Sequence, residues 1–309
     1  KLLPGLILVA FFLLHTASVW ASAPRAEQGV LDLRNSELDD KGLQLEGEWK
    51  LYWNRLLTPT CPAEYYEYVP FPKLWDHTQW KQQPLPTKGY ATYAIDILLP
   101  ATSEPLPLYV PEVYSSYALY ANGSLIAKNG EPGISPETTT PYWSQQVVPV
   151  ASDTDTLRLT LQVANFHHTK GGPYKHIRIG YLSSLQAAQQ ANYALDIFLT
   201  GCLFMGGLFF LGLYLFGHHE KSNLYFSLFC ILYSYRIVGT KQYALHALFP
   251  HFKWALTLHF EYLSLFLSIL MFTLYTHKLY PKDINKYIVR FMAASCISFA
   301  LATLLLPTT

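Results

Sequence analysis

The chain has 309 residues, a formal net charge of +1, 51% hydrophobic residues and 14% charged residues. An ordinary soluble protein has roughly 25% charged residues, so this composition is typical of a membrane protein. The near-zero charge gives no electrostatic reason to expect a nucleic-acid partner. The four cysteines form neither a CxxC pair nor a Cys/His cluster with zinc spacing, so we predict no metal and no cofactor.

Residues 1–23 have the three parts of a signal peptide. A positive start at Lys1 precedes the apolar run Leu6–Leu14, and Ala21-Ser22-Ala23 offers small residues for cleavage. An uncleaved membrane anchor is the alternative, and either way the following residues, 27–185, are expected to be exported. The chain begins without Met and stops just after an apolar segment, so we expect a fragment that lacks a C-terminal output domain.

Residues 27–185 alternate apolar and polar residues, which is typical of antiparallel strands packed on one face. Tyr93, Ile95, Ile97 and Leu99 share one face of the clearest strand. A second strand places the apolar residues of 157–163 opposite Arg158, Thr160 and Gln162. Shorter runs lie at 106–110, 116–120, 124–128, 145–150 and 177–179. Many short strands separated by Pro, Gly and Asn turns predict an all-β sandwich.

The dipeptide Asn122-Gly123 predicts a two-residue hairpin, because both residues accept the positive φ angles of a type I′ turn. The same residues open the glycosylation sequon Asn122-Gly-Ser124. The tight turn explains them without a glycan.

Two aromatic-rich stretches, 47–53 and 113–117, are candidates for ligand recognition. The face of an aromatic ring attracts the C–H groups of a sugar, and nearby polar groups can bind hydroxyls. The alternative is that alternate aromatic residues fill the core, which is the simpler interpretation for Trp49 and Tyr117. Trp53 and Tyr114 are therefore the predicted ligand contacts.

The loop that follows residue 163 contains His167 and His168, followed by Gly171 and Gly172. In a loop, two adjacent imidazoles can converge on an anion, a metal ion or a sugar. We add both histidines to the predicted ligand contacts. The alternative is a surface loop without a ligand, and no third metal ligand is obvious.

From residue 190 to 309 one membrane-length apolar segment follows another. Four spans are predicted, at 193–216, 224–238, 254–275 and 288–306, of which the second is short. Gly206, Gly207 and Gly212 would allow close helix approach in the first span. Residues 183–192 have a helical pattern that would extend this span outward.

The short connections between these spans carry the positive charge. Lys221, Lys278, Lys282 and Lys286 lie in the first and third connections, which the positive-inside rule places in the cytoplasm. This orientation agrees with export of the sandwich, and it predicts a multi-pass protein of a bacterial inner membrane with its N-terminal domain in the periplasm.

Three ionisable residues, Asp196, Arg236 and Glu261, lie in or at the edges of the predicted spans. Charges at such depth are costly and usually face the interior of a bundle. One interpretation is an internal relay that couples ligand binding to helix packing. The other is that Asp196 and Arg236 reach the interfacial water.

The chain resembles the bacterial seven-transmembrane receptors with diverse intracellular signalling modules. The resemblance rests on stretches spread over residues 40–265. These are Gly47-Glu-Trp-Lys-Leu-Tyr-Trp53, Gly89-Tyr-Ala-Thr-Tyr93, residues 110–123, Val163-Ala-Asn-Phe-His-His168 with Gly171-Gly172, Leu224-Tyr-Phe-Ser-Leu-Phe-Cys230 and Glu261-Tyr-Leu-Ser264. It implies an exported sandwich of the jelly-roll, galactose-binding-like type and a bundle of seven helices, of which about four are present. Family members carry histidine kinase, cyclase or phosphatase output modules, and none is visible here, so the sequence assigns no catalytic residue.

The leading hypothesis is a signal-transducing receptor whose sandwich binds a small extracellular ligand, with a carbohydrate as the favoured class. Its other partners would be the lipid bilayer and a second copy in a homodimer. The alternatives are a membrane-anchored carbohydrate-binding protein and a transporter. A simple anchor needs only one helix, and the visible helices lack the matched breaks of a transport pathway.

Overall fold

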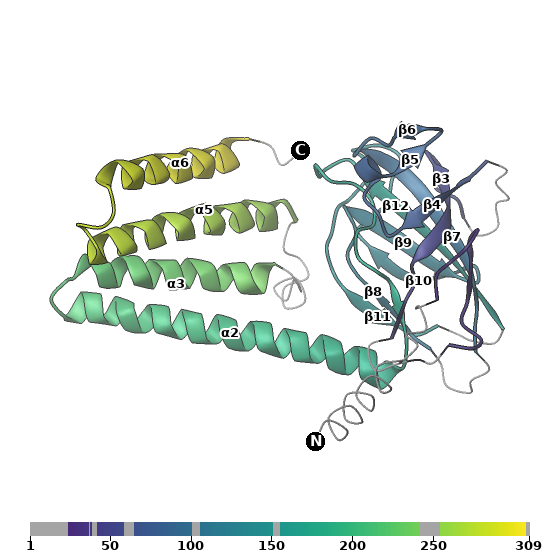
Figure 1. The fold of residues 1–309 in the computed structure, drawn as a ribbon, viewed down its shortest axis with the longest axis horizontal. Helices are drawn as coiled ribbons and strands as arrows, with labels where there is room; N and C mark the ends of the chain where they lie inside the picture. The colour runs from purple at the N-terminus through teal and green to yellow at the C-terminus, as the bar shows by residue number, and fades with distance from the viewer. Residues whose placement is uncertain are drawn as a thin grey trace, which may run out of the picture.

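The computed structural model describes residues 24–36, 38, 42–58, 65–100, 106–150, 155–240 and 254–306. The predicted signal peptide, 1–23, lies outside these residues. A β-rich unit occupies residues 24–179, and four long helices follow it (Figure 1). The fold class predicted from the sequence, an all-β sandwich followed by a helical part, is confirmed.

Two sheets make up the sandwich. The seven-stranded sheet has the order β10-β9-β12-β7-β3-β4, and β1 pairs in parallel with β7. The four-stranded sheet has the order β11-β8-β13-β2, and β5 pairs with β6 separately. The strands are β1 (Val30–Asp32), β2 (Leu43–Gln44), β3 (Gly47–Trp53), β4 (Glu67–Phe71), β5 (Gln79–Trp80), β6 (Gln83–Pro84), β7 (Gly89–Leu98), β8 (Leu108–Val110), β9 (Ser116–Ala121), β10 (Ser124–Asn129), β11 (Gln146–Val148), β12 (Thr156–Asn165) and β13 (Arg178–Ile179).

The core lies between the two sheets, as the alternation predicts. Tyr93, Ile95 and Ile97 of β7 are buried together with the apolar residues of β12, and Leu108 and Ile179 meet them from the second sheet. Trp49 is fully buried and stacks on Phe71 with 3.9 Å between ring centroids. Tyr117 is also fully buried, so the core-filling interpretation of these two aromatic residues is confirmed.

The outer face of the large sheet is partly covered, which the alternation does not predict. Thr92 Oγ1 donates to the carbonyl of Arg55 at 2.8 Å and accepts from the amide of Leu57 at 2.9 Å. Gln162 Nε2 donates to the carbonyl of Leu57 at 3.0 Å. These bonds tie residues 55–57 across the sheet, and they explain why Thr92 and Gln162 are buried on its outer face.

The predicted Asn122-Gly123 hairpin is confirmed, with φ angles of 47° and 91° and with β9 and β10 paired on either side. Asn122 Oδ1 also accepts from the amide of Arg158 at 2.9 Å, which ties the turn to the neighbouring strand β12.

Within the described residues, four helices follow the sandwich: α2 (Leu182–Phe216), α3 (Lys221–Gly239), α5 (Trp254–Leu279) and α6 (Lys286–Leu305). They lie side by side in chain order, and the α2–α3 and α5–α6 connections are at the end away from the sandwich (Figure 1). Among the described helices, α2, α5 and α6 are long and apolar enough to cross a membrane. The predicted second span forms helix α3, which is not among these three candidate spans and which lies between α2 and α5 (Figure 1).

Helix α2 continues from the sandwich without a flexible linker. Only Gly180 and Tyr181 separate β13 from this helix of 35 residues, which at 1.5 Å per residue is about 50 Å long. Leu185 is buried against the backbone of the sandwich near Gly42. Of the three predicted contact glycines, Gly207 lies against α3, where an added Cβ would be 2.8 Å from Ile231. Gly206 and Gly212 face open space within the described part of the chain.

Candidate functional site

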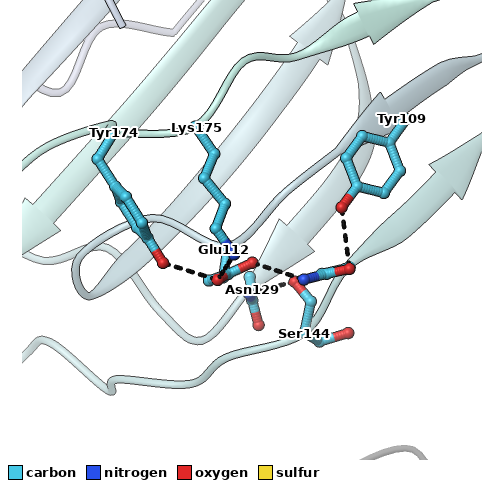
Figure 2. A network of polar contacts seen from close by, with 7 residues as sticks. Tyr109, Glu112, Asn129, Ser144, Tyr174 and Lys175 are labelled. Atoms are coloured by element: carbon cyan, nitrogen blue, oxygen red, sulfur yellow. Dashed lines mark hydrogen bonds and ion pairs between the residues drawn. The ribbon is translucent and has the colours of Figure 1, made fainter. Parts of the chain in front are cut away.

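The side of the sandwich that faces the helices is built around a buried carboxylate. Glu112 follows strand β8, and its side chain is only 1% exposed. Its Oε1 accepts from the hydroxyl of Tyr174 at 2.7 Å and forms an ion pair with Lys175 (Figure 2). Its Oε2 accepts from Gln145 Nε2 at 3.0 Å. Such a carboxylate can be buried because charged and polar donors replace the water that it loses.

The network continues through Gln145 to strand β8 of the small sheet. The hydroxyl of Tyr109 donates to Gln145 Oε1 at 2.9 Å, and burial raises the pKa of Tyr109 above its usual value. Asn129 Nδ2 donates to the carbonyl of Ser144 at 3.0 Å and so fixes the segment that carries Gln145 (Figure 2). The network therefore links β8, β10 and the residues before β11 to the loop before β13.

An aromatic stack lies beside this network. The ring of Tyr114 lies between those of His168 and Tyr174, at centroid distances of 4.4 and 4.5 Å and with interplanar angles of 2° and 12°. Trp143 meets the rings of Tyr114 and His168 edge to face. Both faces of the Tyr114 ring are covered, so a sugar has no free face of this residue on which to stack. Its role as a ligand contact stays a prediction.

Asn165 holds the loop that carries the two histidines. Its fully buried side chain donates through Nδ2 to the carbonyls of Thr87, His168 and Lys170 at 2.8–2.9 Å. Its Oδ1 accepts from the amide of His168 at 3.1 Å. One side chain thus closes the loop on itself and ties it to the segment before β7.

The loop also depends on Gly172, which has a φ of +92° and packs on Trp75. We expect Gly172→Ala to destabilise the protein by about 2 kcal/mol more than Gly123→Ala, the range for overpacking, because its new Cβ would lie 2.6 Å from the Trp75 ring. Gly123 is a matched control, since its φ is +91° and an added Cβ meets nothing within 4 Å. Thermal unfolding of both variants checks this, and equal losses would contradict it.

His168 is the titrating group of the stack. Burial lowers its pKa below the usual 6.5. Nδ1 lies 3.0 Å from the amide of Lys170 and 3.1 Å from its carbonyl, so either protonation state finds a partner and burial disfavours the charged one.

The lowered pKa of His168 predicts a pH dependence of stability. The unfolded chain binds a proton at this residue below about pH 6.5, and the folded chain binds it less readily. The contribution of His168 to the free energy of unfolding is therefore most favourable above pH 6.5, where both states leave the ring neutral. It becomes less favourable as the pH falls, because the unfolded chain takes up the proton first. We expect the melting temperature of the wild type to drop more between pH 7.5 and 5.5 than that of His168→Phe, which keeps the stack. An equal drop in both proteins would show that another group is responsible.

Aromatic packing joins the sandwich to helix α5. Trp143 meets Trp254, the first residue of α5, edge to face at 5.4 Å, and Leu258 and Tyr114 complete the cluster. On the other side, Gln189 of α2 lies 3.5 Å from the carbonyl of Gln145. The part of the sandwich around Glu112 therefore contacts α5 through Trp143 and α2 through Gln145.

A cleft of about 340 Å³ lies between the Glu112 network and the helices. The sandwich contributes Glu112, Tyr174 and Lys175, and the helices contribute Arg236 of α3 and Glu261 of α5 among its lining residues. Arg236 Nη1 donates to the backbone carbonyl of Glu261 at 3.3 Å, which links α3 to α5. No carboxylate forms an ion pair with Arg236 within the described residues.

The predicted site residues therefore fall into different places. Tyr114 and His168 are in direct contact, and Arg236 and Glu261 line one cleft with Glu112. Trp53 is half-buried and meets Trp75 edge to face, so it supports the core rather than the stack.

Two further predicted residues lie apart from these groups. His167 Nε2 lies 3.0 Å from the carbonyls of both Pro136 and Thr139. Asp196 is buried on α2, and its Oδ2 has no hydrogen-bond partner among the described residues. Their proposed roles in ligand binding and coupling stay predictions. Among the described residues, no three His, Cys, Asp or Glu side chains form a group that could hold a metal ion.

Sequence reasoning did not place Glu112, Trp143, Tyr174, Lys175 or Trp254 in the site. The charged residue in the stretch Val110-Pro-Glu-Val113 is a signal that could have found the first, because a carboxylate among apolar residues needs buried partners. The other four come together only through long-range packing.

Comparisons with known proteins find similar solved structures and one matching family. Among solved structures, it is similar to β-glucuronidases from an uncultured Clostridium species (16% identity, TM-score 0.37), Faecalibacterium prausnitzii (18%, 0.33) and Ruminococcus gnavus (13%, 0.33). These matches cover 46%, 43% and 44% of this chain and only 29%, 23% and 27% of the other chains. No curated protein matches. Residues 192–309 match the family described as 7TM diverse intracellular signalling, and the helical part of the chain therefore belongs to this family of membrane signalling receptors.

Proposed function

We propose that this protein is a membrane receptor whose exported sandwich binds a carbohydrate-like ligand and passes the signal to the helices. The observation that carries the proposal is the shared cleft. The buried Glu112–Lys175 pair of the sandwich lines the same space as Arg236 and Glu261 of the helices. A change at either side of this cleft alters the surroundings of the other, which is the physical requirement for coupling between two sites.

The direct connection to α2 supports the same proposal. A long flexible linker would let the sandwich move without consequence for the helices, whereas α2 begins two residues after β13 and is anchored by buried Leu185. A ligand that prefers one arrangement of this junction shifts the helices toward that arrangement by its difference in affinity.

The same geometry supports a proposed orientation in the membrane. The connections α2–α3 and α5–α6 lie at the end of the helices opposite the sandwich (Figure 1), and Lys221, Lys278, Lys282 and Lys286 lie in them or in the adjoining helix ends. Placing positive charge in the cytoplasm puts the sandwich in the periplasm of a bacterial inner membrane. The signal would then reach an output module, such as a kinase or a cyclase, on the cytoplasmic side.

Ligand-dependent thermal stabilisation of the full chain tests the proposal. The protein is held in a detergent without a sugar head group and screened against mono- and disaccharides. We expect at least one sugar to raise the melting temperature, since a ligand at 100 times its dissociation constant adds about 2.7 kcal/mol of stability. The acyclic polyol sorbitol is the control, because it offers hydroxyls without a ring. If no saccharide stabilises the folded protein, the carbohydrate assignment is wrong.

A further inference from the structure

The outer face of the large sheet contains a hollow that shares no lining residue with the Glu112 network. Ala94 of β7 lies between Lys50 of β3 and Thr160 of β12 in the strand register. Thr92 and Asp96 lie on the same face of β7, two residues to either side. A methyl group among larger neighbours leaves a pocket of about 220 Å³, lined by these five residues among others.

Hydrogen bonds hold one wall of the pocket in place. Leu57 and Thr58 line it on one side, and the bonds from Thr92 and Gln162 to residues 55–57 hold this segment over the sheet. Tyr52 lines it from β3. Because backbone and side-chain hydrogen bonds fix these groups, the pocket exists before a ligand arrives, which lowers the entropic cost of binding.

The polar groups of the pocket are arranged for hydroxyls. Asp96 accepts from Arg158 Nε at 2.9 Å through Oδ1, and Lys50 Nζ lies 3.7 Å from its Oδ2. The side chains of Asp96 and Lys50 keep 26% and 24% of their surface exposed, so both still reach solvent. A sugar hydroxyl both donates and accepts, and it can bond to the carboxylate and to the ammonium or guanidinium at the same time.

Exposed tyrosines continue from the pocket along the same face. Tyr52 lies 5.6 Å from Tyr66, which meets Tyr68 edge to face at 5.4 Å. Tyr66 and Tyr68 are each 40% exposed, and Lys50 Nζ is 5.8 Å from the ring of Tyr66. A row of half-exposed rings beside paired charges can take the apolar C–H face of a sugar ring.

We propose that this pocket, with Ala94 as its floor and with Lys50, Tyr52, Asp96 and Arg158 around it, binds one sugar ring of a carbohydrate. The inference rests on the proposed function and gives it a location. A volume of about 220 Å³ is below the roughly 300–1,000 Å³ of pockets for drug-sized ligands, and it suits a single ring. Tyr66 and Tyr68 lie where further rings of an oligosaccharide would continue.

Titration calorimetry on the full chain tests the location. The probes are glucose, galactose, mannose, N-acetylglucosamine, glucuronate, maltose and cellobiose, in a detergent without a sugar head group. Ala94→Leu fills the hollow without removing a polar group, and Asp96→Asn keeps the shape but removes the charge. Ala187→Leu is the matched control, because Ala187 is exposed on α2 outside the pocket. We expect both pocket variants to bind at least about tenfold more weakly, Asp96→Asn because it weakens a hydrogen bond to a charged group and Ala94→Leu because it occupies the space of the ring, and we expect the control to bind as the wild type does.

The other outcomes distinguish a wrong pocket location from a wrong carbohydrate assignment. If a sugar binds the wild type and both pocket variants equally well, it binds elsewhere, so the pocket proposal is wrong while the carbohydrate receptor stands. If no probe binds the folded wild type, both the pocket proposal and the carbohydrate assignment are wrong. Circular dichroism and the melting temperature of each variant show whether a loss of binding comes from the pocket or from unfolding. Ala94→Met, which fills the hollow with a flexible side chain, replaces Ala94→Leu if the latter fails to fold.

Discussion

Replacing Glu112 with alanine is expected to lower the free energy of unfolding by about 3 kcal/mol, the lower end of the range for removing one partner of a buried ion pair. The change leaves Tyr174, Lys175 and Gln145 without the acceptor that they share. The lower end applies because the Lys175 side chain is 36% exposed and regains water. The midpoint of urea unfolding, followed by tryptophan fluorescence, measures the loss.

Two further variants serve as controls for this result. Glu27→Ala removes an exposed carboxylate and should change the stability by less than about 0.5 kcal/mol, as is usual for surface positions. Glu112→Gln keeps the shape and one acceptor oxygen, so it should lie between the wild type and the alanine variant. A Glu112→Ala protein as stable as Glu27→Ala would mean that the network does not hold this face of the sandwich.

Replacing Asn165 with aspartate should destabilise the protein by at least about 3 kcal/mol, because a buried charge then keeps only the His168 amide as a donor and faces three carbonyl oxygens. The side-chain nitrogen now faces three carbonyl oxygens, and a carboxylate oxygen in its place would meet only other acceptors. The histidine loop should open, and with it the stack of His168 on Tyr114. Thermal unfolding gives the stability, and proteolysis within residues 166–172 reports the opening.

The same substitution at an exposed site separates the local effect from that of the added charge. Asn35 is exposed in a turn, so Asn35→Asp should leave both the stability and the proteolysis pattern unchanged. Raising the acidity should partly rescue Asn165→Asp, since a protonated acid can donate to one carbonyl. A variant that is fully stable at pH 7 would contradict the role given to Asn165.

Local patterns predicted the elements of the sandwich well. The alternation at β7 and β12 fixes which side chains face the core, and Asn122-Gly123 is a turn that few other residues could form. The helices are equally visible in the sequence, because an apolar segment of membrane length can form few structures other than a helix. The segment at residues 55–57 was missed, since a strap over a sheet depends on hydrogen bonds between residues far apart in the sequence.

The site was predicted only in part for the same reason. Tyr114 and His168 were singled out as ligand contacts, but their contact arises from two loops 54 residues apart. Arg236 and Glu261 are visible in the sequence because charges are rare in membrane spans, whereas no such pattern marks Glu112, which lines the same cleft. Ala94 carries no signal at all, because a small residue matters only when its neighbours in the register are known.

Amide hydrogen exchange on the full chain tests the coupling of sandwich and helices most directly. The protein is compared with and without a saturating saccharide from the thermal screen, and peptides covering the sandwich, the end of α3 near Arg236 and the start of α5 near Glu261 are followed. A receptor coupled through the Trp143–Trp254 contact and the shared cleft should change exchange in all three regions, and Trp254→Ala should weaken the response of the helices. A change confined to the sandwich would contradict the account and would leave a carbohydrate-binding domain that is merely anchored to the membrane.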